Sequence, residues 1–501
     1  MIPLTTKAIL KQSTKRKRSP CRPPKTVQMA QDQCSTTISS LRSLLKVFED
    51  ESNQCILVSG EAGTGKTRLL KDFWEHLRTK NSSLRIAITA PTGVAAVNVG
   101  GVTLHSFVGM GLMRGSLEDI MKKGLSQRCR DAFRKTDVLI VDEISMVDPS
   151  MLGKIEAMAR LARLGRALYK KKGAVLFGGM RLVMFGDFMQ LPPIQRSCAK
   201  VKYVFQTGVW KAMDVVRLRL HKVHRQNDLE FLQFLRQLRQ GELTQQGMAT
   251  LESRVVEDEL SPDVKRTRLC SHRNTVETYN SRRLEELDSP KICLAGFFEV
   301  RKVRRSGAPN LAMGEPNATA SKGAPDDDLV AAGVRTAQTE RILKVVRLSA
   351  ESRFPVSADL EIKKGAQVMM RNNQYLKLGI CNGSIGVVLE ATSVCITVDF
   401  AGTHIGLRRY PFFHRYSREY DVVLRQFPLM LAWAMTIHKS QGMTLSAAHL
   451  DADCFEYGQL YTAFSRVRSL KDLSLSRPVT DKSLLVNEDA LEFERLPCTP
   501  I

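Results

Sequence analysis

Residues 60–67 read GEAGTGKT, and this octapeptide constrains the fold of the chain more than any other segment. It follows an apolar, β-rich run at 55–59 and precedes a helical stretch that contains Phe73 and Trp74. The pattern G-x-x-x-x-G-K-[ST] between a strand and a helix is typical of a phosphate-binding loop. A glycine-rich turn that merely resembles such a loop would lack this setting. The octapeptide therefore predicts a nucleotide-binding α/β domain.

The loop also predicts which atoms hold the nucleotide. Its glycines let backbone N–H groups curl around phosphate oxygens, and the N-terminus of the helix adds its positive dipole end. Lys66 would reach the β- and γ-phosphates of the nucleotide, and Thr67 would ligate Mg²⁺. The nucleotide-binding residues expected in the loop are Gly60, Glu61, Ala62, Gly63, Thr64, Gly65, Lys66 and Thr67.

A pair of acidic residues follows another apolar, β-rich run. Asp142 and Glu143 directly follow four apolar β-formers at 138–141. A bare Asp-Glu pair is usually solvated surface, but one at a strand end downstream of a phosphate-binding loop completes a nucleotide hydrolysis site. Asp142 would hold Mg²⁺ through water, and Glu143 would act as the general base on the attacking water.

Three further polar residues are candidates for hydrolysis. Gln190 lies in GDFMQLPP at 186–193, just beyond an apolar run, where it could sense the γ-phosphate. Arg225 lies in HRQ, and Arg466 lies in TAFSRVR at 462–468. An arginine delivered to the transferred phosphoryl group accelerates hydrolysis strongly. Taken in isolation, either arginine would more often be a surface residue.

The apolar pattern predicts a doubly wound α/β domain. Helical stretches separate the short β-rich runs, and each run is nearly continuous in apolar residues, as in parallel strands covered on both faces. An amphipathic helix is expected before the first run, at 38–48. No apolar run approaches the roughly 18 residues of a membrane span. The predicted strands are 55–59, 85–89, 138–141 and 181–185.

Two segments differ in composition from the rest. Residues 1–31 carry eight Lys and Arg and no acid before Asp32, which predicts a flexible basic arm. The run 15–18 resembles a nuclear-import patch, while a mitochondrial transit peptide and a DNA-contacting tail are alternatives. Residues 301–345 are rich in Gly, Pro, Ala and charge without a hydrophobic period, which predicts a flexible insertion.

The charge balance indicates a polyanionic partner. The 501 residues have a formal net charge of +24, which favours nucleic acid, although a basic organellar or ribosome-associated protein has the same balance. The 11 cysteines are scattered without a C-x-x-C pair, so no zinc site is expected. His221 and His224 form a lone H-x-x-H that we interpret as structural.

Taken together, these motifs resemble the Pif-family DNA helicases of helicase superfamily one, relatives of RecD. The resemblance covers roughly residues 29–475, and the order of the motifs makes it specific. The matching segments are GEAGTGKT at 60–67, TAPTGVAA at 89–96, TLHSF at 103–107, DEISM at 142–146, FGG at 177–179, GDFMQLPP at 186–193, TIHKSQGMT at 436–444 and YTAFSRVR at 461–468.

The resemblance implies two RecA-like lobes with ATP between them and small inserted subdomains, including a β-barrel in the second lobe. The first lobe would comprise 32–220, and the second would comprise 221–300 and 425–501 with a C-terminal tail. A β-rich subdomain at 346–424 would interrupt the second lobe.

The family's residue roles map onto matching positions. Gln33 would read adenine, with Gln28 and Gln31 as nearby alternatives, and Gln441 would couple nucleotide to DNA. For Phe107, a core position under a loop is as plausible as stacking on a base. The residues in motifs that would line the single-strand path are Thr92, His105, Phe107, His438, Lys439 and Tyr461.

The resemblance implies an ATP-dependent DNA helicase with 5′→3′ movement on single-stranded DNA, acting on single-stranded and forked DNA in genome maintenance, repair or recombination. A motor acting chiefly on RNA or RNA–DNA hybrids, and a non-catalytic ATP-gated nucleic-acid binder, are the alternatives. ATP and Mg²⁺ are the implied cofactors. A nuclear location is expected, with the mitochondrion as the alternative, and the absence of a visible dimerisation motif favours a monomer.

Overall fold

The computed structural model describes most of the chain from residue 39 onward. The basic arm 1–31, Gln33 and most of the 301–345 insertion lie outside the described residues, so the predictions on them stay open. Within the described ranges, no helix is long and apolar enough to cross a membrane. The described residues are 39–109, 118, 124–165, 173, 175–194, 202–256, 266–302, 337–372, 374–375, 378–380, 382–416, 420–480 and 482–501.

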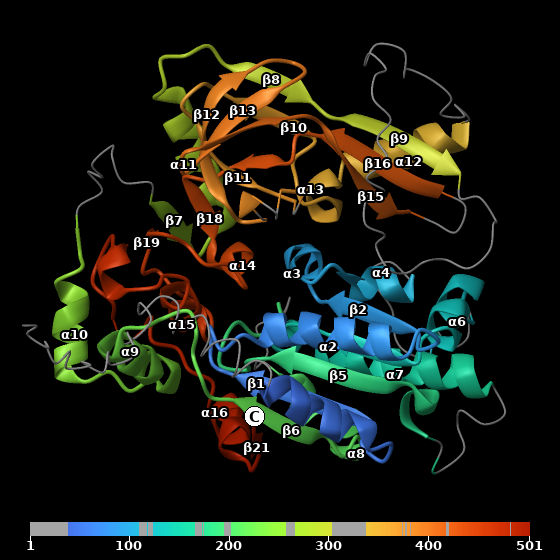
Figure 1. Ribbon diagram of the computed structural model, residues 1–501. Helices are drawn as coiled ribbons and strands as arrows, with labels where there is room; N and C mark the ends of the chain where they lie inside the picture. Colours follow the sequence, from blue (N-terminus) through green and yellow to red (C-terminus); the bar gives the residue numbers. More distant parts are fainter. Residues whose placement is uncertain are drawn as a thin grey trace, which may run out of the picture.

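A seven-stranded parallel sheet forms the first lobe, at the bottom of Figure 1, in the order β21-β6-β1-β5-β4-β2-β3. The four predicted runs are its central strands, each shifted by no more than one residue at either end. The bounds are β1 Cys55–Gly60, β2 Ile86–Ala90, β3 Val102–Thr103, β4 Val138–Val141, β5 Arg181–Gly186, β6 Val216–Leu220 and β21 Thr499–Pro500.

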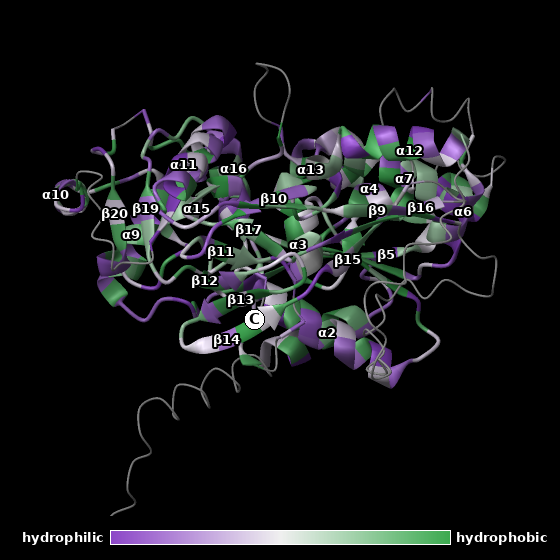
Figure 2. Ribbon diagram, turned by 90° about the horizontal axis from the view of Figure 1, so that it is seen from above, coloured by the Kyte–Doolittle hydropathy of each residue, from purple (hydrophilic) through white to green (hydrophobic). Residues whose placement is uncertain are grey.

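Helices cover both faces of this sheet, which explains why its central strands are apolar throughout. Ile56 and Val58 pack on one face of the sheet against α2 (Lys66–Lys80) and the helix at 39–49, which confirms the amphipathic helix predicted at 38–48. Leu57 packs on the opposite face with α7 (Pro149–Leu164). In Figure 2, α2 carries both hydrophobic and hydrophilic residues, as expected for a covering helix.

The helices of this lobe are mostly short. Among the described helices of this lobe, α2 and α7 are the longest, and both flank the sheet (Figure 1). Between β1 and β6, the described α-helices of this lobe are α2 Lys66–Lys80, α3 Gly93–Asn98, α4 Leu104–Val108, α6 Gln127–Arg134, α7 Pro149–Leu164 and α8 Gly208–Ala212.

A four-stranded parallel sheet in the order β18-β7-β19-β20 forms the second lobe. A long insertion separates β7 from the other three strands, as the resemblance implies. Strand bounds are β7 Thr267–Cys270, β18 Ala434–Thr436, β19 Ala448–Leu450 and β20 Leu473–Leu475; helix bounds are α9 Leu229–Gln240, α10 Gln245–Glu252, α11 Arg273–Glu285, α14 Ile437–Ser440 and α15 Gln459–Phe464.

The insertion is antiparallel and has its own apolar cores. Its five-stranded sheet, β14-β13-β12-β11-β17, stands where the β-barrel is expected, and Gly383 forms a turn there with φ +98°. A three-stranded sheet, β15-β16-β9, and a pair, β10-β8, adjoin it. Bounds are β8 Ile292–Ala295, β9 Phe297–Lys302, α12 Ala337–Arg347, α13 Ala350–Arg353, β10 Asp359–Ile362, β11 Gln367–Met370, β12 Ile385–Ala391, β13 Ile396–Phe400, β14 Thr403–Leu407, β15 Tyr410–Arg415, β16 Tyr420–Gln426 and β17 Leu429–Leu431.

The end of the chain differs from the expectation that 425–501 belongs to the second lobe. After β20, helix α16 (Glu488–Arg495) and strand β21 return to the first lobe, where β21 pairs in parallel with β6 at its edge (Figure 1). Phe493 drives this return, because its ring stacks on Phe205 at a centroid distance of 4.3 Å. The aromatic contact buries the apolar face of α16 against the first lobe.

Candidate functional site

The expected phosphate-binding loop lies between β1 and α2, as its sequence context predicts. Gly65 caps α2 with φ +86°, and Gly63 has φ +82°. A Cβ atom on Gly63 would lie 2.8 Å from Cβ of Arg225, so both conformation and space require glycine there. The loop is therefore built around a close approach to the segment carrying Arg225.

Lys66 is folded back on its own loop. Its Nζ atom donates hydrogen bonds to the carbonyl oxygens of Gly60 at 2.7 Å and Glu61 at 2.9 Å. Burial lowers the pKa of Lys66, while the carboxylates of Asp187, Glu143 and Asp142 oppose this shift. A buried ammonium that donates to two carbonyl oxygens is suited to bind an incoming anion such as a phosphate.

Asp142 and Glu143 form a buried acid pair at the end of β4. Thr67 Oγ1 donates to Asp142 Oδ2 at 3.2 Å, and the backbone N–H of Glu143 donates to Asp142 Oδ1. Burial, then the charge of Glu143, raises the pKa of Asp142 to about 7, and burial also raises the pKa of Glu143. A carboxylate beside a hydroxyl oxygen matches the oxygen donors that Mg²⁺ prefers.

Glu143 is held in an unusual backbone conformation, with φ +52°. Such a value is rare for a residue with a side chain and persists only where surrounding contacts enforce it. Gln441, just after α14, donates from Nε2 to Glu143 Oε2 at 3.0 Å. The expected general base is thus contacted by the second lobe.

Gln190 and the two candidate arginine fingers meet at the same place. Arg466, only 1% exposed, donates from Nη2 to Gln190 Oε1 at 3.1 Å. Arg225 donates to Thr444 Oγ1 and to the carbonyl oxygen of Ser465. Burial, then the positive charge of Arg466, lowers the pKa of Arg225. The structure thus brings both predicted arginines together beside the hydrolysis residues.

Two of the residues expected to contact DNA are buried inside the protein. Tyr461 is buried against the loop, where its Oη accepts from the Ala62 N–H at 2.9 Å and donates to Asp187 Oδ2 at 3.4 Å. Phe107 is 3% exposed and packs edge-on against Phe133, so of its two interpretations the core position holds. Neither ring is available to a base here, and we correct both assignments.

The other four lie on, or directly before, three short helices that form a row facing the insertion (Figure 1). Thr92 caps the start of α3, and His105 is on α4. On α14, Lys439 is exposed and His438 pairs with Glu456 at 3.1 Å. A Cβ on Gly442, after α14, would lie 3.2 Å from the Asn98 amide of α3, so these helices from different lobes are adjacent.

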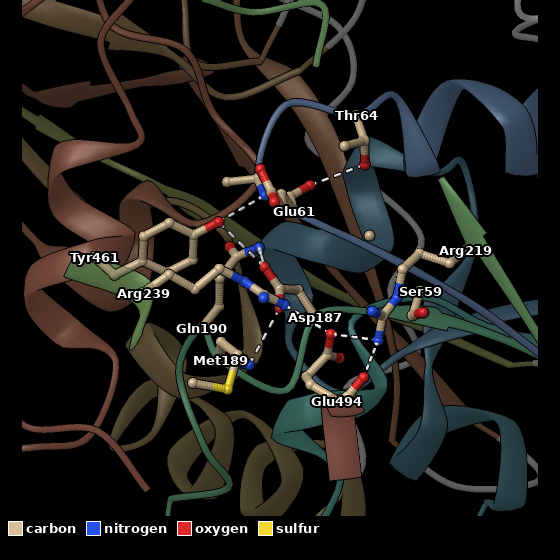
Figure 3. Close-up of polar contacts among 12 residues, drawn as sticks. Ser59, Glu61, Thr64, Asp187, Met189, Gln190, Arg219, Arg239, Tyr461 and Glu494 are labelled. Atoms are coloured by element: carbon tan, nitrogen blue, oxygen red, sulfur yellow. Dashed lines mark hydrogen bonds and ion pairs between the residues drawn. The ribbon is translucent and has the colours of Figure 1, made fainter. Parts of the chain in front are cut away.

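Three site residues escape reasoning from the sequence (Figure 3). Asp187 is fully buried next to Gln190, and its place inside GDFMQLPP was a usable signal. Arg239 of α9 donates to Asp187 Oδ1 at 2.9 Å, and the same nitrogen donates to Glu494 of α16 at 3.0 Å. Neither Arg239 nor Glu494 lies in a recognisable motif.

Comparisons with known proteins agree with this geometry. A family model described as PIF1-like helicase matches residues 32–248. The ATP-dependent DNA helicase PIF1 of Xenopus laevis is 32% identical over 431 residues, which cover 84% of this chain and 59% of the relative. The ATP-dependent DNA helicase Pif1 of Bdellovibrio bacteriovorus is 30% identical over 448 residues, 88% of each protein.

Solved structures agree as well. Pif1 from Bacteroides sp in complex with ADP-AlF4 has a TM-score of 0.67 at 27% identity and covers 91% of this chain and 95% of its own. The Bacteroides structure with ADP-AlF3 and ssDNA has a TM-score of 0.60 at 28% identity, covering 91% and 96%. The chain spans 58–61% of the length of the vertebrate relatives it matches. Because the Bdellovibrio relative matches over most of its own length, this chain belongs to the PIF1-like helicase family.

Proposed function

We propose that this chain is an ATP-driven helicase that moves 5′→3′ along single-stranded DNA and separates the strands of forked DNA. The observation that carries the proposal is the convergence of both lobes on the phosphate-binding loop. Gln441 and Arg466 of the second lobe contact Glu143 and Gln190 of the first. Such contacts let nucleotide binding and release change the relation between two lobes.

The hydrolysis residues divide the work as follows. Lys66 leaves its carbonyl partners to bind the phosphates, and Glu143 takes a proton from the attacking water. Burial favours this role, because a raised pKa makes the Glu143 carboxylate a stronger base. Arg466 and Arg225 neutralise the charge that develops on the transferred phosphoryl group.

Thr67 and Asp142 would hold Mg²⁺ through their adjacent oxygens. The cation supplies charge neutralisation on the phosphates when it is bound. The residues fit this role because the Asp142 carboxylate and the Thr67 hydroxyl lie 3.2 Å apart and both offer oxygen donors.

In this proposal, few residues connect the nucleotide site with the expected DNA-binding residues. Gln441 directly follows α14, which carries His438 and Lys439. Loss or gain of the Gln441–Glu143 contact would therefore shift the start of the expected single-strand path. The Bacteroides relative, whose solved complexes contain ADP-AlF3 and ssDNA, supports the same arrangement of ligands for this chain.

Strand displacement on forked DNA tests activity and direction together. We expect ATP-dependent displacement of a fork with a 5′ single-stranded tail and not of one with a 3′ tail. Displacement from the 3′ tail alone would reverse the direction, and displacement only of RNA-containing forks would favour the RNA motor. Lys66→Ala should abolish displacement and DNA-stimulated hydrolysis while single-strand binding persists.

The biological setting is also a proposal. We expect action on the nuclear genome in maintenance, repair or recombination, with mitochondrial DNA as the alternative, by a monomer. Deleting residues 1–31 and imaging the full-length and shortened chains tests whether the arm carries a targeting signal. Unchanged nuclear targeting would leave only DNA contact as the role of the arm.

A further inference from the structure

Asp187 is a fully buried carboxylate to which the proposed hydrolysis mechanism gives no role. It accepts hydrogen bonds from three side chains that belong to three separate parts of the chain (Figure 3). Gln190 Nε2 donates at 3.1 Å, Arg239 Nη2 at 2.9 Å and Tyr461 Oη at 3.4 Å. A carboxylate with this many partners is fixed in position.

The fixed carboxylate determines how the Gln190 amide faces. An ionised carboxylate only accepts hydrogen bonds, and a guanidinium only donates them. Gln190 must therefore turn Nε2 toward Asp187 and Oε1 toward Arg466, as observed. If Asp187 moved away, the amide could flip and turn its N–H groups toward Arg466. The orientation of Gln190 thus depends on what holds Asp187.

Arg239 is the charged partner that holds Asp187. Its side chain is only 12% exposed, and one nitrogen, Nη2, bridges the carboxylates of Asp187 and Glu494. Glu494 is in turn held by Arg219 of β6 at 2.8 Å. A buried charge of this kind is stable only while its partners stay in place. The bridge therefore anchors Asp187 to α16 and to the edge of the first sheet.

We propose that Arg239 is a positioning residue for ATP hydrolysis, which acts through Asp187 to align Gln190 with Arg466. The inference rests on the proposed function, and it assigns a part in ATP turnover to Arg239 of α9 and to α16, both of which lie outside the matching motifs. Since Gln190 and Arg466 act on the transition state, misalignment lowers kcat and leaves the KM for ATP nearly unchanged.

The test compares two variants of the full chain in DNA-stimulated ATP hydrolysis. Arg239→Gln should lower kcat roughly 10- to 100-fold, with KM within about 2-fold of the starting protein. Arg239→Lys should recover most of kcat, because a single nitrogen makes both bridging contacts and a lysine ammonium carries three donors. A raised KM with normal kcat, or a lysine variant as slow as the glutamine variant, would overturn the proposal.

Controls separate this effect from general damage. Arg282→Gln removes an exposed arginine from an ion pair with Glu286 on α11 and should leave kcat unchanged. If circular dichroism shows that Arg239→Gln does not fold, Glu494→Ala is the second variant. It removes the carboxylate that fixes Arg239 Nη2 in place, so Arg239 no longer holds Asp187 in one position and kcat should fall while KM does not change. Normal kcat in either folded variant rejects the positioning role. Lys66→Ala tests the proposed function separately, since it should abolish turnover whatever Arg239 does.

Discussion

Gln441 Nε2 donates a 3.0 Å hydrogen bond to Glu143 Oε2, although 298 positions separate the two residues. Both side chains are buried, and the bond joins the start of the second lobe's polar loop to the end of β4. The same carboxylate is the proposed general base. Any movement of α14 therefore reaches Glu143 through one side chain.

Gln441→Ala should uncouple hydrolysis from DNA. The variant lacks the amide that ties Glu143 to the helix carrying His438 and Lys439, so added single-stranded DNA should stimulate hydrolysis far less than in the starting protein. The measurement is the ratio of ATP turnover with and without a single-stranded oligonucleotide. An undiminished ratio would show that coupling runs elsewhere.

Arg466→Lys should lower kcat by roughly 10³-fold, the scale of losing an arginine finger, with little change in ATP affinity. Lysine retains the charge but not the planar donors that bind Gln190 Oε1 and the Thr462 carbonyl together. Single-turnover hydrolysis and titration with a fluorescent ATP analogue separate the two quantities. Equal losses in rate and affinity would argue against a finger.

Tyr461→Phe removes one hydroxyl and leaves the ring. The buried Ala62 N–H loses its acceptor, which should cost about 1–3 kcal/mol of unfolding free energy. Asp187 loses one donor as well, so hydrolysis should slow. Urea unfolding measures the first effect and ATP turnover the second. If Tyr461 instead contacts DNA, the variant would weaken single-strand binding and leave the stability unchanged.

The acid pair predicts an unusual dependence of stability on pH. Because the pKa of Asp142 rises from 3.8 to about 7 on folding, the folded state binds more protons than the unfolded state between those values. The free energy of unfolding contributed by this group therefore falls as pH rises from about 4 to 7. In thermal melts without divalent cation, the stability of the starting protein should therefore fall more between about pH 4 and 7 than the stability of the Asp142→Asn variant.

Adding Mg²⁺ to the same melts tests the cation site. Stabilisation should be larger at pH 8 than at pH 5, since the cation competes with protons for the same carboxylate. The Asp142→Asn variant is the matched control and should respond less. Equal stabilisation of both proteins at both pH values would place the cation elsewhere.

Phe493→Ala should lower the free energy of unfolding by about 3–5 kcal/mol, as expected for a truncated buried aromatic residue. The ring contacts Phe205 and Phe188, and the Arg217 guanidinium lies 4.1 Å from its centroid. Phe413→Ala, at a position 63% exposed, is the control and should change stability by less than about 0.5 kcal/mol. Equal effects would mean that α16 does not stabilise the first lobe.

Much of the first lobe and its loop could be predicted from the sequence. Apolar runs separated by helical stretches identify β1, β2, β4 and β5, because a parallel sheet buried on both faces leaves a continuous apolar signature. The loop at 60–67 and the acids at 142–143 carry their signals locally. The family resemblance is confirmed by relatives matched along most of the chain.

The remaining parts depend on contacts without a local signal. Arg239 and Glu494 are 255 positions apart, and each looks like an ordinary charge on an amphipathic helix until α16 packs beside α9. Tyr461 belongs to a matching motif, but a motif does not tell which way a side chain points. For Phe107, burial is decided by α6, whose Phe133 covers it.

The pairing of β21 with β6 has a consequence for biosynthesis. Thr499 aligns with Leu218, so the first sheet receives its last strand only after the ribosome has made nearly all of the described chain. While the second lobe and its insertion emerge from the ribosome, Phe205 and the edge of β6 in the nascent first lobe stay uncovered. Such long-range pairing is slow and exposes apolar surface, so this interval is the point at which the growing chain depends most on chaperones.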